Sequence, residues 1–431
     1  MDLIRQLASR LAEHCPEAYL VGGCVRDLLR GDPVKDLDVA VNADPFRVGK
    51  SLADALRGHV FWLDQDEGVV RVILPHHERL QVDVCRLRGT LARDLSERDL
   101  TINALALPVA GVSRAAGPAG DFDSAGITDL CGGREDLRRG VIRFVSPESP
   151  VRDPLRVLRA LRFRWKLGFE FDPATRVLLE TCVPRLASVS AERIRDEWFQ
   201  LLMLPDPVPA VVECLHVGLA PWITGGAAGS MTGPAVRPGA EGINHLAAQL
   251  TCLLEWTAVA PALLAEEPSQ GRKRRELLLW TAVLQGVAPD CDVAEACRGL
   301  ALSSDERKIA SKALGAGEMV RDLCRRWPVA GKDRLRLFQA AAPGEVEAIL
   351  LGALALGRAP APAEMLQEAL SHRSGPPAPL LTGQQIMETL GLRPGPQVGR
   401  WMRALEEARA DGDVLTPDGA LQWLTEQARS R

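Results

Sequence analysis

The feature that most constrains this chain is a change of sequence pattern near residue 127. Before it, short apolar runs alternate with turns rich in Gly, Pro and Asp, which is the pattern of a mixed α/β unit. After it, apolar residues recur at helical spacing through most of the chain. A chain of 431 residues is longer than one compact core usually organises, so we expect two to four domains. The sequence predicts an α/β head followed by an all-helical remainder in two or three pieces.

Local signals place the elements of the head. Helices are predicted over residues 1–15 and Val25–Leu29. Strands are predicted at Ala18–Val21, Leu37–Val41, Val69–Leu74 and Leu80–Cys85. We expect the last two strands to form a hairpin around His76–Glu78. Stretches rich in Gly, Pro and Ala predict a surface loop at 108–126 and breaks in the helical part at 225–241 and 371–379.

Composition narrows the class of protein. Hydrophobic residues make up 46% of the chain and charged residues 25%, so folded cores can form. No apolar run approaches the ~20 residues of a membrane-spanning helix, and the N-terminus lacks the apolar core of a signal peptide. The ten cysteines include no C-x-x-C pair, which argues against zinc and indicates free thiols of a reducing compartment. We therefore expect a cytoplasmic protein with no membrane partner.

Net charge and aromatic content limit how such a chain can bind nucleic acid. The formal net charge is −4, so a nucleic-acid binder of this composition must concentrate its basic residues locally. Aromatic residues make up only 4%, which argues against base stacking on aromatic side chains as the main mode of binding.

The first motif with chemical content is L-V-G-G-C-V-R-D-L-L-R-G, residues 20–31, followed by K-D-L-D-V at 35–39. Asp36 and Asp38 alternate on a predicted strand, so both carboxylates point to one face. Two carboxylates that close repel unless a cation lies between them, and Mg²⁺ prefers such oxygen ligands. Gly22 and Gly23 lie at a strand–helix turn, where the backbone can approach a triphosphate closely. Each piece alone is also found in ordinary turns and solvated strands; together they indicate a nucleotide and metal site.

Two further motifs are basic. The first is E-R-D-L-T-I-N-A-L-A-L, residues 97–107, in which Arg98 is a candidate to contact a phosphate or ribose. The alternative interpretation of this motif is a helix start that is capped by Asp99 or Thr101. In R-D-P-L-R-V-L-R-A-L-R-F, residues 152–163, Asp153 and the following proline predict a helix start.

The helix predicted after Asp153 has an apolar arc formed by Val157, Leu158, Leu161 and Trp165. Its other face carries Arg152, Arg156 and Arg159. The alternative is a solvated arginine face, but an arginine fork beside an aspartate can also hydrogen-bond base edges.

These motifs, in this order, resemble the family of tRNA nucleotidyltransferases and bacterial poly(A) polymerases, the class of CCA-adding enzymes of bacteria and eukaryotes. The resemblance runs from residue 20 to about 204, with D-L-C-G-G-R-E-D-L-R-R-G-V-I-R (129–143) and V-S-A-E-R-I-R-D-E-W (189–198) as further motifs. A block at 380–399 resembles the family's tail. The resemblance implies a polymerase-beta-like mixed α/β head with helical neck, body and tail. The corresponding ranges are 1–126 for the head, 127–205 for the neck, 206–370 for the body and 371–431 for the tail.

The resemblance also implies roles for individual residues. Asp36 and Asp38 match the pair that binds Mg²⁺, and Asp83 is a candidate third carboxylate. Asp153 and Arg156 match the pair that reads the base of CTP or ATP. The positions that match contacts to the incoming nucleotide are Gly22, Gly23, Arg26, Arg98, Arg159 and Arg162. The expected activity is untemplated, two-metal addition of nucleotides to the 3′ end of tRNA, with no DNA partner.

The chain departs from the family pattern in ways that leave the product open. Arg152 lies at a position where the family often has Glu, and Glu97 lies at a position where it often has Arg. Only the segment 84–97 separates Asp83 from Arg98, and members that add only CC resemble this chain in that shortened loop. Four alternatives remain: an enzyme that adds only CC, an enzyme that adds the full CCA, a poly(A) polymerase, and a non-catalytic RNA-binding relative. No His-Asp dipeptide occurs, so His245 is expected to be an ordinary helical histidine.

Overall fold

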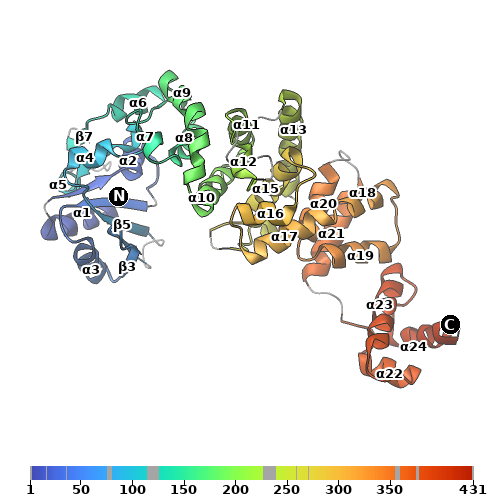
Figure 1. Cartoon of the computed structure of the whole chain (residues 1–431). Helices are drawn as coiled ribbons and strands as arrows, with labels where there is room; N and C mark the ends of the chain where they lie inside the picture. Colours follow the sequence, from blue (N-terminus) through green and yellow to red (C-terminus); the bar gives the residue numbers. More distant parts are fainter. Residues whose placement is uncertain are drawn as a thin grey trace. The chain divides into compact units, whose positions relative to one another are not determined.

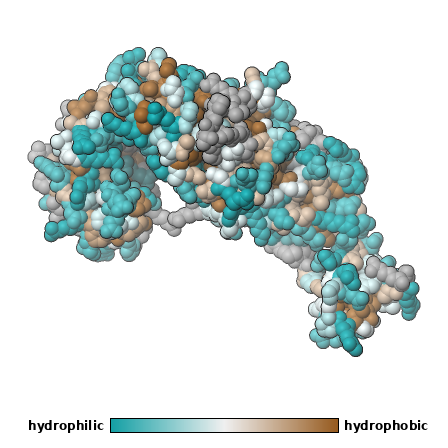
Figure 2. All heavy atoms as spheres, viewed as in Figure 1, coloured by the Kyte–Doolittle hydropathy of each residue, from teal (hydrophilic) through white to brown (hydrophobic). Residues whose placement is uncertain are grey.

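The computed structural model describes residues 2–15, 17–34, 36–74, 80–113, 126–226, 239–258, 260–269, 271–354, 360–374 and 378–429. The chain forms two compact units, Met1–Ser190 and Ala191–Arg431, each with its own core (Figure 1). The visible surface is mainly hydrophilic, with apolar side chains in small groups (Figure 2).

A mixed seven-stranded sheet forms the centre of the first unit. Its order is β3-β4-β5-β2-β1-β6-β7, with β2 and β5 parallel and the other neighbours antiparallel. The strands are β1 (Ala18–Val21), β2 (Asp36–Val41), β3 (His59–Asp64), β4 (Val69–Leu74), β5 (Leu80–Arg86), β6 (Leu105–Pro108) and β7 (Thr128–Asp129). A separate parallel pair joins β8 (Val141–Ile142) and β9 (Glu170–Phe171).

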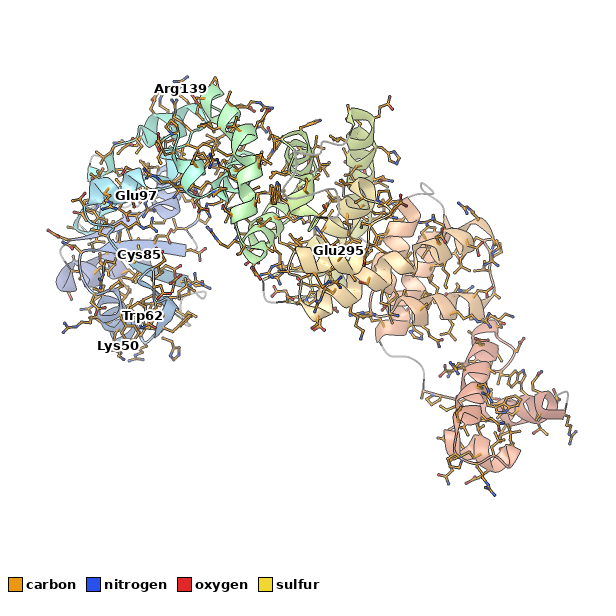
Figure 3. The ribbon with its side chains drawn as sticks, in the orientation of Figure 1. Lys50, Trp62, Cys85, Glu97, Arg139 and Glu295 are labelled. Atoms are coloured by element: carbon orange, nitrogen blue, oxygen red, sulfur yellow. The ribbon has the colours of Figure 1, made fainter. Side chains whose placement is uncertain are left out.

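Helices fill the rest of the first unit. They are α1 (Asp2–His14), α2 (Gly23–Arg30), α3 (Pro45–Leu56), α4 (Leu91–Ser96), α5 (Val109–Ser113), α6 (Gly133–Arg139), α7 (Ser149–Arg152), α8 (Arg156–Leu167) and α9 (Pro173–Cys182), with 3₁₀ turns η1 (Thr101–Asn103) and η3 (Val183–Ser188). Apolar residues of α1, α3 and α5 pack on one face of the sheet in a single cluster. At the sheet edge, Trp62 of β3 stacks on Phe46 of α3 with ring centroids 5.3 Å apart (Figure 3).

The two faces of β2 have different surroundings. Leu37, Val39 and Val41 belong to the large core beneath α1 and α3. The alternate residues point to the opposite face, where Ala40 and Leu95 of α4 belong to a smaller cluster. That cluster covers only one end of the strand, so Asp36 and Asp38 lie on the open part of the sheet.

The predicted head agrees with the structure in most elements. All four predicted strands are present, and β4 and β5 pair as an antiparallel hairpin, although its turn lies outside the described residues. Strand β3 and helix α3 were not predicted. The loop prediction at 108–126 is wrong at its start, because Val109 and Val112 of α5 are buried against the sheet. Residues 114–125 lie outside the described part.

The remainder is mostly helical, as predicted, with two-residue strands in β7, β8 and β9. The prediction of a helix beginning at Asp153 is wrong by a few residues, since α8 begins at Arg156. Asp153 instead accepts a hydrogen bond from the Leu155 N–H at 3.3 Å in the turn before the helix. Arg152 belongs to α7, so it does not share a helical face with Arg156 and Arg159.

In the described residues of the second unit the regular elements are all helices, joined by turns and short loops, with an isolated β-bridge between Ser269 and Arg272. The helices are α10 (Ala191–Leu202), α11 (Val208–His216), α12 (Ala220–Ile223), α13 (Ala240–Thr257), α14 (Pro261–Leu264), α15 (Arg274–Val287), α16 (Val293–Gly299), α17 (Ser304–Gly315), α18 (Gly317–Arg325), α19 (Gly331–Ala341), α20 (Glu345–Leu354), α21 (Pro360–Ser374), α22 (Gly383–Leu390), α23 (Pro396–Asp411) and α24 (Pro417–Arg429). Helices α22, α23 and α24 share an apolar cluster of their own.

The predicted breaks in this unit are only partly described. Residues 227–238 of the first break lie outside the described part, and α13 begins within its last residues. The second break begins later than predicted, because α21 continues to Ser374. His245 is an exposed residue of α13.

Two properties of the whole chain bear on the compositional expectations. All ten cysteines are free thiols. Within the described ranges, no single helix has both the length and the apolarity to span a bilayer; only the bent pair α19–α20 passes that test as a combination.

A buried ion pair joins α15 to α20 in the second unit. Arg274 donates from Nε to one Glu347 oxygen and from Nη2 to the other, both at 2.7 Å. The side chains are only 3% and 2% exposed, and Arg274 also donates to the Pro343 carbonyl. Since a buried charge is costly without its partner, each of these two residues depends on the other.

Removal of one partner tests that dependence. We expect Glu347→Gln to lower the free energy of unfolding of the second unit by about 3–5 kcal/mol, because the buried Arg274 loses its charged fork partner and keeps only the longer charged contact to the half-exposed Glu266, at 3.8 Å. The measurement is urea unfolding followed by circular dichroism. The control is Glu407→Gln, which breaks the equally well-formed but exposed fork to Arg336 and is expected to cost under about 1 kcal/mol. An equal loss of unfolding free energy in the two variants would contradict the mutual dependence of Arg274 and Glu347.

Candidate active site

Three carboxylates lie on the open face of the sheet. Asp36 and Asp38 alternate on β2, and Asp83 of β5 is paired with Asp38 in the parallel register. Residues in register on adjacent strands point to the same face. Asp36 is exposed and Asp38 is partly buried. The structure thus brings together the three carboxylates that the sequence singled out.

The surroundings of Asp38 favour a bound cation. Burial is the largest influence on this carboxyl and raises its pKa, and the charges of Asp83 and Asp36 raise it further. Arg98 and Arg159 oppose the shift, and the pKa reaches about 6. A carboxyl whose pKa is raised by burial and by neighbouring carboxylates gains more from a nearby cation than a solvated carboxyl does. Asp36 and Asp38 together are a donor set that fits a hard divalent ion such as Mg²⁺.

Asp83 differs from the other two because it already has a cationic partner. Arg71 of β4 donates from Nε to Asp83 Oδ1 and from Nη2 to Oδ2, both at 2.7 Å. Across the described parts of the chain, no three His, Cys, Asp or Glu side chains gather into a set that could hold a metal. A cation here would have Asp36 and Asp38 as its protein ligands, and phosphate oxygens commonly complete such a Mg²⁺ shell.

The glycine turn before α2 fits closely against the carboxylates. Gly22 has φ 76°, a conformation that favours glycine, and its N–H donates to the Leu105 carbonyl at 3.0 Å. A Cβ on Gly22 would lie 2.7 Å from Arg98 Nη1 and 3.5 Å from Asp38 Oδ2. Glycine is therefore favoured here by the backbone conformation, and a side chain would also displace the end of Arg98, which lies directly beside the turn.

Arg26 is held in a buried network behind the turn. Its Nη1 donates to Asn103 Oδ1 at 2.6 Å and its Nε to Asp27 at 2.8 Å. The Asn103 amide donates in turn to Asp99 Oδ1 at 3.1 Å. The guanidinium also lies over the Phe163 ring, 5.0 Å from its centroid. These contacts connect α2 to η1 and to α8.

Asp99 is the centre of this network. Burial alone would raise its pKa, but the charge and hydrogen bonds of Arg159, with those of Asn103 and the Leu100 N–H, lower the pKa to about 2. Arg159 donates from Nε and Nη2 to Asp99 Oδ2 at 2.9 and 2.8 Å. A permanently ionised Asp99 thus fixes the direction of the Arg159 side chain.

A cavity of about 460 Å³ opens between these groups. Most of the predicted residues line it: Gly22, Gly23, Arg26, Asp36, Asp38, Arg98, Arg159 and Arg162. Other charged residues of its wall are Asp27, Arg30, Asp32, Asp99 and Lys166. The cavity combines carboxylates at one end with several guanidinium groups, an arrangement that suits a metal-bound polyphosphate.

The base-reading pair predicted at Asp153 and Arg156 does not line this cavity. Arg156 donates to the carbonyls of Glu97 and Arg98, at 2.6 and 2.8 Å, and to the Ser149 hydroxyl. Its guanidinium therefore supports the backbone that carries Arg98. The role of the pair stays a prediction.

Sequence reasoning did not assign Asp99, and its capping alternative is wrong. Neither Asp99 nor Thr101 caps η1, whose N-cap is Leu100 without a side-chain hydrogen bond. Thr101 donates instead to Asp136 at 2.7 Å. The signal in the sequence was an aspartate directly after Arg98, at the start of a segment that becomes apolar toward Leu107. Its partner Arg159 is 60 residues away, so spacing alone could not pair them.

Comparison with known proteins adds independent information. Residues 18–143 match the family model described as the poly A polymerase head domain. Residues 168–224 match the probable RNA and SrmB- binding site of polymerase A. The first match covers the sheet, the glycine turn and all three carboxylates.

Similar proteins span nearly the whole chain. A CC-adding tRNA nucleotidyltransferase of Geobacter sulfurreducens is 32% identical over 422 residues, covering 95% of this chain and 92% of the relative. An A-adding tRNA nucleotidyltransferase of Deinococcus radiodurans is 32% identical over 451 residues, covering 95% of each. A CCA-adding enzyme of Thermotoga maritima complexed with tRNA has the same fold, with a TM-score of 0.69 at 21% identity over 99% of this chain and 95% of that one. A CCA-adding enzyme in complex with CTP also has this fold, with a TM-score of 0.74 at 21% identity over 99% of this chain and 94% of that one.

The predicted fold, a mixed α/β head followed by helices, is confirmed by these structures. The extent and identity of the two relatives also settle the family. This chain belongs to the tRNA nucleotidyltransferase family and is a nucleotidyltransferase.

Proposed function

We propose that this chain adds cytidines to the 3′ end of tRNA, taking CTP as its nucleotide and using Mg²⁺ held by Asp36 and Asp38. The observation that carries the proposal is that these two carboxylates line the same cavity as Arg26, Arg98 and Arg159. The CC-adding relative supports it, because it matches nearly the whole chain. Ten free cysteines support the cytoplasm as its location.

Each part of the site has a proposed task. Bound divalent metal activates the attacking hydroxyl and stabilises the leaving pyrophosphate in such enzymes. Asp36 and Asp38 hold the metal and therefore fix where the RNA end and the triphosphate meet. Gly22 and Gly23 leave space for the triphosphate beside the backbone, and Arg98 lies next to that space. Arg26, Arg159 and Arg162 supply further positive charge to the phosphates or the ribose.

Base selection is proposed for Asp153 and Arg156, but the geometry favours an indirect route for the arginine. Arg156 holds the carbonyls of residues 97 and 98, so a change in its position moves Arg98.

We also propose the division of the chain into a head (1–126), a neck (127–205), a body (206–370) and a tail (371–431), with the helical parts contacting tRNA.

The product is proposed from the segment between Asp83 and Arg98. Residues up to Arg86 belong to β5 and residues 91–96 to α4, so only 87–90 and Glu97 lie outside regular structure. Leu95 of α4 is fully buried. A base pocket changes its preference only if something moves it, and this short, packed connection supplies little freedom. We therefore propose CC addition, with a partner enzyme adding the terminal A.

A second candidate function is addition of only the terminal adenosine, which is supported by similarity to the A-adding relative of Deinococcus radiodurans. That protein is as similar to this chain as the CC-adding one, so identity does not separate the two. A complete CCA-adding enzyme and a poly(A) polymerase are the remaining outcomes of the product assay below.

The metal pair is tested by substitution. We expect Asp36→Ala and Asp38→Ala each to reduce nucleotide transfer by on the order of 10²–10³ or more, because the charges that stabilise the transition state are lost. tRNA affinity and thermal unfolding should stay close to wild type. The control, Asp54→Ala, removes an exposed aspartate of α3 and should leave the rate unchanged. Activity of both variants within about tenfold of wild type would rule out the metal assignment.

Base selection is tested by competition among nucleotides. Arg156→Ala and Asp153→Ala should relax discrimination among CTP, ATP, UTP and GTP more than they weaken triphosphate binding, since base contacts specify whereas phosphate contacts position. Arg152→Ala, at an exposed neighbour, is the control. Unfolding must be measured as well, since the Asp153 hydrogen bond to Leu155 can be worth about 1 kcal/mol. If UTP and GTP stay excluded as strongly as in wild type, other residues read the base.

The product is tested at single-nucleotide resolution. Three tRNA transcripts, ending before CCA, after C and after CC, are each incubated with CTP or ATP alone. We expect rapid addition of two Cs and slow or absent addition of A, because the pocket has no moving part to change its preference. Fast A addition to the CC end, together with C addition, would identify a complete CCA-adding enzyme. Addition of a single A without C addition would identify the A-adding alternative, and repeated A addition would identify a poly(A) polymerase.

A further inference from the structure

Four residues in register form a row across the open face of the sheet. Phe61 of β3 is opposite Arg71 of β4, Arg71 is opposite Asp83 of β5, and Asp83 is opposite Asp38 of β2. Adjacent strands lie about 4.8 Å apart, so Arg71 is within roughly 10 Å of the carboxylates assigned to the metal. The row therefore places a fixed positive charge next to a site for a cation.

The contact between Arg71 and Asp83 uses both carboxylate oxygens. Nε and Nη2 each donate at 2.7 Å, in the planar fork geometry that makes arginine–carboxylate pairs strong and directional. The pair is partly shielded, with side-chain exposures of 29% and 21%. The hydrogen bonds that Arg71 donates to Asp83 raise the pKa of Arg71, and the charges of Asp83, Asp36 and Asp38 add to that effect. Arg71 is thus charged at any working pH and close to all three aspartates.

We propose, on the basis of the proposed function, that Arg71 withholds Asp83 from the metal. Asp83 is then not a third ligand, and Arg71 acts as a positioning residue that leaves Asp36 and Asp38 as the protein's ligands. The pair contributes no net charge to the site, whereas an unpaired Asp83 would contribute one negative charge.

The consequence concerns the ligand positions that are left for substrate. Mg²⁺ takes near-octahedral coordination, so each protein carboxylate in the shell removes one position from phosphate or hydroxyl oxygens. A shell with two protein carboxylates leaves more positions open and binds the free ion more weakly. The metal would then be held firmly only together with the triphosphate.

The test measures metal binding directly on the full-length chain, without nucleotide. Mn²⁺ is the probe, and the free ion is counted by electron paramagnetic resonance. Arg71→Met removes the guanidinium and keeps most of its apolar stem. We expect it to bind Mn²⁺ roughly tenfold more tightly, because Asp83 is released and one positive charge is lost nearby. Arg71→Lys keeps the charge but not the fork, so its gain should be smaller.

The decisive variant is the charge-neutral double substitution Arg71→Met/Asp83→Asn. If Asp83 is withheld in the wild type, the affinity of the double variant for Mn²⁺ should stay within about threefold of wild type, because the net charge near the metal is unchanged. Weakening by tenfold or more would show that Asp83 is a ligand and would overturn the proposal. Unchanged binding in Arg71→Met would overturn it too. Arg138→Met, which breaks the exposed fork to Glu135 of α6, is the matched control and should have no effect.

Two further variants separate this proposal from the proposed function. Asp36→Asn and Asp38→Asn should each weaken Mn²⁺ binding strongly. If they do not, the metal assignment itself fails and the proposal fails with it. If both variants weaken Mn²⁺ binding, the metal assignment stands. Unchanged binding in Arg71→Met, or tenfold weaker binding in the double variant, would then show that only the proposed role of Arg71 is wrong.

Discussion

Leu37, Val39 and Val41 alternate with Asp36 and Asp38 along β2, and the first unit depends on that alternation. The apolar residues fill the core beneath α1 and α3, while the carboxylates face the cavity. A register slip of one residue would place both aspartates in the core, so burial of the apolar residues enforces the register. Parallel pairing with β5 then fixes Asp83 beside Asp38. The hydrophobic effect that folds this sheet also sets the spacing of the reactive carboxylates.

Asp99 has the corresponding role for the arginines. A carboxylate that is only 8% exposed is tolerated because Arg159, Asn103 and a backbone N–H all donate to it. Asn103 is in turn the acceptor for Arg26. Two arginines from α2 and α8, far apart in the sequence, are therefore oriented by one buried charge. These contacts lie within the protein itself, so the fold holds the arginines in place, which is the condition for electrostatic stabilisation of a reaction.

Sequence reasoning predicted the local features and missed the long-range ones. Strand periods, glycine turns and the Asp36–Asp38 spacing are properties of a few neighbouring residues, so they can be read directly. Strand β3 was missed because Phe61, Trp62 and Leu63 form a continuous apolar run, without the alternation of a half-buried strand, and are exposed at the sheet edge. The partners of Asp99, Arg71 and Arg156 could not be predicted, because each pair is brought together by tertiary folding. The helix start after Asp153 was placed too early because an aspartate–proline pair also begins a turn.

Several arginines of the cavity already have carboxylate partners within the protein. Arg26 contacts Asp27, Arg98 contacts Asp94 and Arg159 contacts Asp99. Under the proposed function, an incoming triphosphate meets arginines whose charge is largely compensated, so that phosphate oxygens replace or share carboxylate partners as it binds. Such an exchange releases fewer solution counterions than binding to uncompensated arginines would. Nucleotide affinity in this site should consequently depend less on ionic strength than the number of its arginines implies.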